Sequence, residues 1–116
     1  MIAPILLFCM LVFHCEIAHA NSYTVGGASG WTFGVASWPN GKQFKASDTL
    51  NFIYNNTFHN VVEVNKAGYH SCSVSNAIRK YNSGHDEIAL RTGNNYFICG
   101  FPGHCQRGMR IALKAT

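Results

Sequence analysis

The stretch CGFPGHCQRGM, residues 99–109, places a cysteine, a histidine and a methionine at equal intervals of five residues. Its Pro and Gly residues permit the tight turns that would aim Cys99, His104 and Met109 at one point. An apolar run precedes the stretch and an alternating run follows it. We therefore predict that it forms a loop before the closing strand of a β domain.

A fourth donor is available from His59, which stands just past a predicted turn and before the valine-rich run 61–64. A side chain at the start of a strand can emerge at one end of a β-sandwich. Two imidazoles, one thiolate and a weak thioether form the ligand set of a blue-copper centre, and this mixed set suits both Cu(I) and Cu(II). We predict one type 1 copper ion held by His59, Cys99, His104 and Met109.

Residues 1–20 predict a secretory signal peptide. Residues 2–13 are almost unbroken apolar sequence, and Ala18-His19-Ala20 is the small-x-small pattern typical of signal peptidase sites. About 12 apolar residues fall short of the roughly 20 that a membrane-spanning helix needs. We expect cleavage after Ala20, which leaves a secreted domain of residues 21–116 without a membrane anchor.

The cysteine count favours a thiolate bound to metal. Cys9 and Cys15 leave with the predicted signal peptide, and three cysteines remain in the mature domain. In an oxidising compartment two of the three should pair, and the third needs another fate. A bridge from Cys72 to Cys105 would leave Cys99 for the metal, whereas a bridge from Cys72 to Cys99 would leave Cys105 free.

A structural zinc site is the rival interpretation, because Cys and His are the residue types that hold zinc. Its ligands would be Cys72, Cys99, His104 and Cys105. Adjacent donors at 104 and 105 are awkward to bring to one ion, and secretion favours a disulfide, so we prefer copper. His70 and His85 have no Cys or Met at ligand spacing, and we expect both on the surface.

From Ser22 onward the chain predicts an all-β domain, because short apolar or alternating segments are separated by Gly, Asn and Pro without a sustained helical period. Turns are expected at residues 65–68 and 93–95, and one short helix around residues 77–80. The expected strands are residues 22–25, 31–35, 50–54, 61–64, 86–90, 96–99 and 110–114. Seven to eight such strands predict a Greek-key β-sandwich.

The charge balance is basic, with nine Lys and Arg against five Asp and Glu and a formal net charge of +4. Loss of residues 1–20 raises this charge by one, because Glu16 leaves and no Lys or Arg does. A basic surface favours encounter with acidic partners. The basic residues are scattered singly, which argues against nucleic-acid binding.

One sequon, Asn55-Asn56-Thr57, lies in a predicted turn. In a secreted protein such a site can accept an N-linked glycan. Asn55 is therefore a candidate glycosylation site.

The mature sequence resembles the phytocyanins, and specifically their plantacyanin or basic blue protein branch, over essentially all of residues 21–116. The segments that carry the resemblance are residues 23–27, 30–33, 38–39, 59–62, 96–99, 101–105 and 108–109. The resemblance implies a cupredoxin-like Greek-key sandwich, the same four copper ligands, and a disulfide between Cys72 and Cys105. A Met rather than a Gln at position 109 indicates the plantacyanin type.

The resemblance also implies roles for neighbouring residues and for the whole protein. Asn60 would tie the two ligand loops together, Phe101 and Pro102 would screen the metal from water, and electrons would leave through the edge of His104. The implied protein is a monomeric outer-sphere electron carrier in the apoplast or cell-wall matrix, not an enzyme. The alternative is an extracellular interaction or signalling protein, in plant reproduction or the cell wall, whose basic surface matters more than redox activity.

Overall fold

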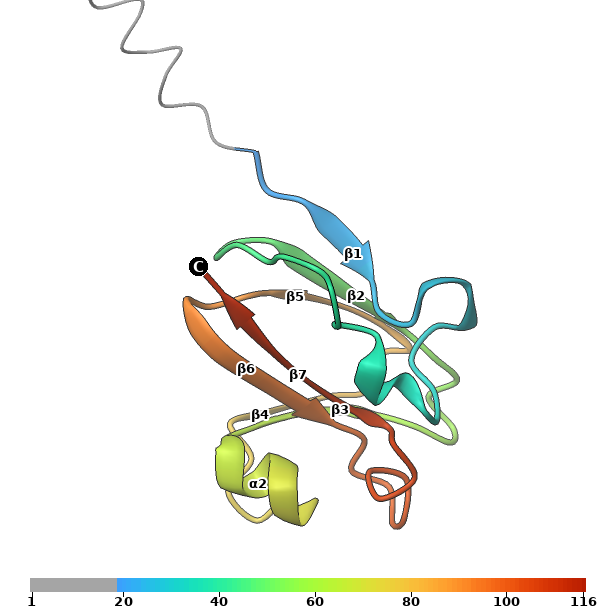
Figure 1. Cartoon of the computed structure of the whole chain (residues 1–116). Helices are drawn as coiled ribbons and strands as arrows, with labels where there is room; N and C mark the ends of the chain where they lie inside the picture. Colours follow the sequence, from blue (N-terminus) through green and yellow to red (C-terminus); the bar gives the residue numbers. More distant parts are fainter. Residues whose placement is uncertain (1–18) are drawn as a thin grey trace, which may run out of the picture.

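The computed structural model describes residues 19–116, so nearly all of the predicted signal peptide lies outside the described residues. The described residues form seven strands in two sheets (Figure 1). In chain order the strands are β1 (Ser22–Thr24), β2 (Thr49–Ile53), β3 (Val61–Val64), β4 (Arg79–Tyr81), β5 (His85–Ala89), β6 (Gly93–Ile98) and β7 (Arg110–Ala115). The helical elements are the short 3-10 turns η1 (Gly27–Ser29) and η2 (Val35–Ser37) and the α-helix α2 (Lys66–Ser71). Within residues 19–116, no helix has the length and apolar character needed to cross a bilayer.

The two sheets have the strand orders β1-β2-β5 and β4-β3-β6-β7. β1 runs parallel to β2, and every other pairing is antiparallel. The chain passes between the sheets after β2, after β4 and again after β5, so the strands on either side of each of these connections lie in different sheets. The predicted Greek-key β-sandwich is confirmed.

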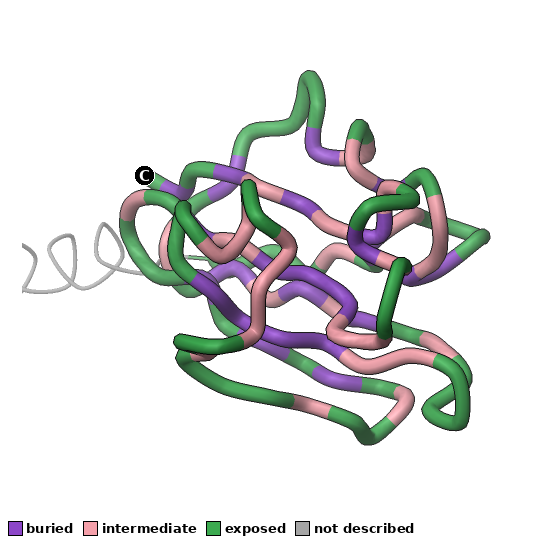
Figure 2. Tube along the Cα trace, turned by 90° about the horizontal axis from the view of Figure 1, so that it is seen from below, coloured by how far each residue is buried: buried purple, intermediate pink, exposed green. Residues whose placement is uncertain are grey.

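The core lies between the sheets, where buried strand segments run through the middle of the molecule (Figure 2). Trp31, Phe52 and Phe97 form a chain of tilted or edge-on aromatic contacts, with ring centroids 5.0 and 5.1 Å apart. In β2 and β7 buried residues alternate with exposed or partly exposed ones, as strands with one core face require. β3 is buried along its whole length, because α2 and its flanking loops cover its second face.

The strand expected at residues 31–35 is wrong. Gly30 and Gly34 both have positive φ, 72° and 73°, and the chain between them turns instead of extending. A Cβ at Gly30 would lie 2.7 Å from the carbonyl oxygen of Ile53, so the turn needs glycine there. The apolar residues Trp31 and Val35 reach the core from this turn, which is why their spacing resembled a strand.

The helix was also expected in the wrong place. Residues 79 and 80 of the expected helix belong to β4, whereas α2 forms at residues 66–71, which overlap the turn expected at residues 65–68. The side chain of Asn65 caps α2, since its Oδ1 accepts a hydrogen bond of 2.8 Å from the Gly68 N–H. The turn expected at residues 93–95 is likewise wrong, because these residues pair with the end of β7 and begin β6.

A disulfide joins Cys72, at the C-terminal end of α2, to Cys105 in the loop between β6 and β7. This is the pairing that the family resemblance implied. Cys99 is left as a buried free thiol, and the rival pairing of Cys72 with Cys99 is wrong. The rival zinc site is also excluded, because the disulfide removes two of its four donors.

The disulfide should contribute strongly to stability, because it closes a loop with a sequence separation of 33 residues. We expect the double variant Cys72→Ala/Cys105→Ala to lose about 3 to 4 kcal/mol of unfolding free energy, an upper estimate from the reduced entropy of the unfolded chain. Urea unfolding of the metal-free protein measures this loss. The double variant Ser71→Ala/Gln106→Ala is the matched control, and equal unfolding midpoints in the two variants would contradict the prediction.

Candidate metal centre

Three donor atoms converge at one end of the sandwich, contributed by His59 before β3, Cys99 after β6 and His104 in the following loop. The Nδ1 atoms of the two imidazoles are 3.1 Å apart. The Cys99 Sγ lies 4.0 Å from Nδ1 of His59 and 3.5 Å from Nδ1 of His104. All three donors therefore lie within 4.8 Å of one another, as ligands of a single ion must.

The surroundings of His59 favour its neutral form. Burial, and secondarily the nearby His104, lowers the pKa of His59 from its ordinary value. A neutral imidazole keeps the lone pair that a metal ligand needs. Cys99 is buried at the same point, so a soft sulfur and two imidazole nitrogens face one small space.

Met109 lies in the same loop, and its side chain is fully buried in the main core. The Met109 N–H donates to the carbonyl oxygen of His104 at 3.1 Å, and the Cys99 N–H donates to the carbonyl oxygen of Met109 at 3.0 Å. These bonds hold the backbone of Met109 beside the segments that carry two of the donors. Its thioether as a fourth ligand stays a prediction.

Asn60 connects the two ligand-bearing segments. Its Oδ1 accepts a hydrogen bond of 2.6 Å from the Gly100 N–H, and its carbonyl oxygen accepts one of 2.9 Å from the Trp31 indole. A Cβ at Gly100 would lie 3.0 Å from Val62 and 3.2 Å from the Asn60 oxygen, so this approach favours glycine. The ligand-positioning role that the resemblance implies for Asn60 stays a prediction, which these hydrogen bonds support.

Aromatic rings flank the imidazoles. The Phe101 ring stacks on His104 with a centroid distance of 5.8 Å, whereas Phe33 meets His104 edge-on at 4.8 Å and His59 at 5.5 Å. Pro102 is exposed in the loop, and its screening role stays a prediction.

The sequence predicts a strand at residues 31–35 and no site role for Phe33. The turn that carries Phe33 also contacts the ligand loop directly. The Gly34 N–H donates to the carbonyl oxygen of Arg107 at 3.3 Å, and a Cβ at Gly108 would lie 3.1 Å from the Gly34 Cα. The Arg107 guanidinium lies 4.1 Å from the Phe33 ring centroid. The glycine spacing was the available signal, since Gly30 and Gly34 bracket the turn.

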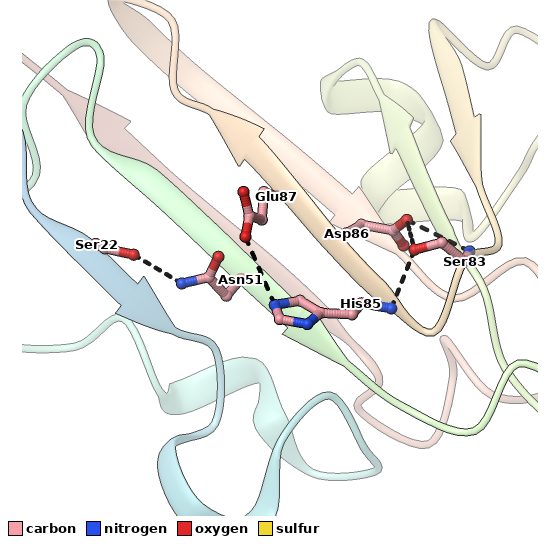
Figure 3. A network of polar contacts seen from close by, with 6 residues as sticks. All are labelled: Ser22, Asn51, Ser83, His85, Asp86 and Glu87. Atoms are coloured by element: carbon pink, nitrogen blue, oxygen red, sulfur yellow. Dashed lines mark hydrogen bonds and ion pairs between the residues drawn. The ribbon is translucent and has the colours of Figure 1, made fainter.

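The remaining mature histidines lie away from the donor cluster on exposed positions, as expected. His85 stands on the outer face of the smaller sheet, where its nearest charged partner is Glu87 at 3.9 Å (Figure 3). His70 is in the last turn of α2. Neither adds a ligand to the site formed by His59, Cys99 and His104.

The donor chemistry fits copper. Thiolate and thioether sulfur stabilise Cu(I), imidazole nitrogen binds Cu(II), and the two imidazoles with one cysteine are the basal set of a blue-copper site. The described residues bring these donors together at one end of the sandwich without any carboxylate in the cluster. This set therefore suits electron transfer better than hydrolysis.

Comparisons with known proteins agree with this chemistry. The chain matches the family model "Plastocyanin-like domain" over residues 31–109. It is 54% identical to a chemocyanin of Lilium longiflorum over 106 residues, covering 91% of this chain and 84% of that protein. It is also 54% identical to the basic blue protein of Cucumis sativus over 93 residues, covering 80% of this chain and 97% of that protein.

A solved structure supports the same assignment. The chain superposes on cucumber basic protein, a blue copper protein, with a TM-score of 0.79 and 53% identity, covering 82% of this chain and 99% of that one. More than half of the chain thus matches the family model, and the fold and the metal donors agree with it. The chain therefore belongs to the plastocyanin-like blue copper proteins that function in electron transfer, within the phytocyanins of the plantacyanin, or basic blue protein, type.

Proposed function

We propose that His59, Cys99, His104 and Met109 hold one copper ion in a secreted electron carrier that is not an enzyme. The observation that carries this proposal is the convergence of two imidazole nitrogens and one buried cysteine sulfur within 4.8 Å. When bound, copper supplies a one-electron couple between Cu(II) and Cu(I). The protein chain holds the donors in place and controls how a partner reaches them.

The chain holds the donors in position before and after electron transfer. Backbone hydrogen bonds close the loop between Cys99 and Met109, and Asn60 fixes that loop to the segment carrying His59. Ligands on a rigid frame need little rearrangement when the charge of the site changes. Four protein donors leave no open coordination position, whereas catalytic metal sites keep one for water or substrate.

His104 is the route by which we expect electrons to leave. Its ring is partly exposed, whereas Cys99 is 1% exposed. Phe33 contacts this imidazole edge-on and Phe101 stacks on it, and these contacts support a role for the two rings in screening the donors from water. A partner that docks over this end of the sandwich would approach the site through the His104 edge.

The redox partner is proposed to present an acidic surface. The exposed guanidinium of Arg107 stands over the Phe33 ring at the metal end of the sandwich. Phe58, next to His59, is 59% exposed and adds an apolar contact at the same end. With the net positive charge of the chain, this end suits encounter with an acidic protein in an extracellular space.

Secretion and glycosylation belong to the same proposal. The small-x-small pattern ending at Ala20 supports cleavage there, and the domain then functions outside the cell. Asn55 is exposed in the turn before His59, with its Oδ1 accepting a hydrogen bond of 2.9 Å from the Thr57 N–H. Its exposed position leaves the sequon accessible to a glycosyltransferase.

Replacing the thiolate tests the ligand assignment. We expect Cys99→Ser to abolish the intense visible band of thiolate-to-copper charge transfer, because serine oxygen cannot replace the soft sulfur donor. Absorption spectroscopy of the Cu(II)-loaded proteins measures the band, and a free-thiol assay shows that the disulfide between Cys72 and Cys105 is intact. Uptake of Cu(II) by the unsubstituted mature protein without any such band would overturn the proposal.

Removing the link between the ligand segments tests the positioning role of Asn60. We expect Asn60→Ala to weaken copper binding about 10- to 100-fold. The Gly100 N–H loses its acceptor, and the loop that carries Cys99 is then no longer fixed to the segment that carries His59. Competition with a copper chelator measures the dissociation constant. The exposed Asn76→Ala is the control, and similar affinities for both variants would show that Asn60 does not position the ligands.

A further inference from the structure

Asp48 is a buried carboxylate that directly precedes β2. Its side chain is 0% exposed, and its two oxygens accept hydrogen bonds from backbone nitrogens, Oδ1 from Asn21 at 2.8 Å and Oδ2 from Lys45 at 2.9 Å. The bond from Asn21, then the bond from Lys45, and last the charge of Lys45 lower the pKa of Asp48 below its ordinary value, against the opposing effect of burial. The group is therefore an anion in the folded protein.

The other buried acids have partners of a different kind. Glu63 lies 4.0 Å from the guanidinium of Arg91. Asp86 accepts hydrogen bonds from the hydroxyls of Tyr54 and Ser83, and the Ser83 contact is visible in Figure 3. Among residues 19–116, no side-chain cation forms an ion pair with Asp48. The charge of Lys45 acts on Asp48 without forming an ion pair, so the buried carboxylate still has room for a closer counter-charge.

We propose that the counter-charge of Asp48 is the α-ammonium group of Asn21, which is created by cleavage after Ala20, so that Asp48 is the binding site of the mature N terminus. This inference rests on the proposed cleavage. Hydrolysis of the Ala20–Asn21 bond adds the hydroxyl of water to the Ala20 carbonyl carbon and a hydrogen to the Asn21 nitrogen. The new amine takes one more proton from solvent at neutral pH.

The nitrogen of Asn21 needs no movement to form this ion pair. It already lies at hydrogen-bond distance from Asp48, and the carbonyl oxygen of Asn21 accepts a bond of 2.9 Å from the Thr49 N–H. Asn21 is therefore held on both sides of its Cα, just before β1 begins. His19 and Ala20 are exposed, so their removal uncovers no core surface. Cleavage changes a single amide N–H into a charged donor with three hydrogens.

The ion pair would fasten several segments at one end of the sandwich. The carbonyl oxygen of Asp48 accepts a bond of 2.8 Å from the Leu90 N–H, just after β5, and Ala46 donates to the carbonyl oxygen of the C-terminal Thr116 at 2.9 Å. β1, only three residues long, starts beside this junction. Figure 1 shows the start of β1 and the C terminus toward the end of the sandwich away from the loop between β6 and β7. Processing would thus stabilise the end remote from the metal.

The experiment compares protein beginning at Asn21 with protein that retains Ala20, each with Asp48 and with Asp48→Asn. We expect the extra residue to raise the unfolding equilibrium constant at least tenfold when Asp48 is present, because the charge moves away from the carboxylate. In the Asp48→Asn background the extra residue should change the constant less than twofold. Urea unfolding of the metal-free proteins measures both. An equal effect in the two backgrounds, or no effect in either, overturns the ion pair.

A second measurement needs no substitution and holds even if Asp48→Asn does not fold. We expect the α-amine of Asn21 to react with an amine-acylating reagent at least tenfold more slowly than the α-amine of the Ala20-extended protein. Similar rates overturn the proposal. Mass spectrometry of the naturally secreted protein tests the cleavage separately: a first residue other than Asn21 refutes the processing step, whereas Asn21 with similar rates refutes the ion pair alone.

Discussion

The hydrogen bond from the Gly100 N–H to Oδ1 of Asn60 holds together two segments that are 40 residues apart in the sequence. The first segment carries His59 and the second carries Cys99, so this bond links the segment of an imidazole donor to that of the cysteine sulfur. The Trp31 indole fixes Asn60 from the other side through its carbonyl oxygen. Donors held by such bonds do not need to be ordered by the metal, and less of the binding free energy is lost in assembling the site.

Further contacts hold the ligand loop, residues 99–109, and the imidazoles in place. The loop after β6 is closed by backbone hydrogen bonds to Met109, and the disulfide at Cys105 fastens it to the end of α2 immediately beside His104. From the opposite direction, the turn before η2 lays Phe33 against the two imidazoles. The ligand loop is thus held by covalent, polar and apolar contacts that do not involve copper.

Features set by local sequence were predictable. The valine-rich run gave β3 its correct bounds, and the spacing of Cys99 and His104 led to the donors that the structure brings together. The turn around Phe33 was not predictable from periodicity, because its conformation depends on glycines at positive φ and on contact with the distant Ile53 carbonyl. α2 was missed because a helix this short depends on its Asn65 cap and on packing against β3 and β6 instead of on a helical period.

The central claim is that the chain presents one sulfur and two nitrogen donors to copper in a frame that serves both oxidation states. X-ray absorption fine structure at the copper edge, recorded on the mature protein as Cu(II) and as Cu(I), tests it most directly. The account predicts one short copper–sulfur and two copper–nitrogen distances in both states, with the same donors retained on reduction. A spectrum without the short sulfur neighbour, or loss of a nitrogen neighbour on reduction, would contradict it.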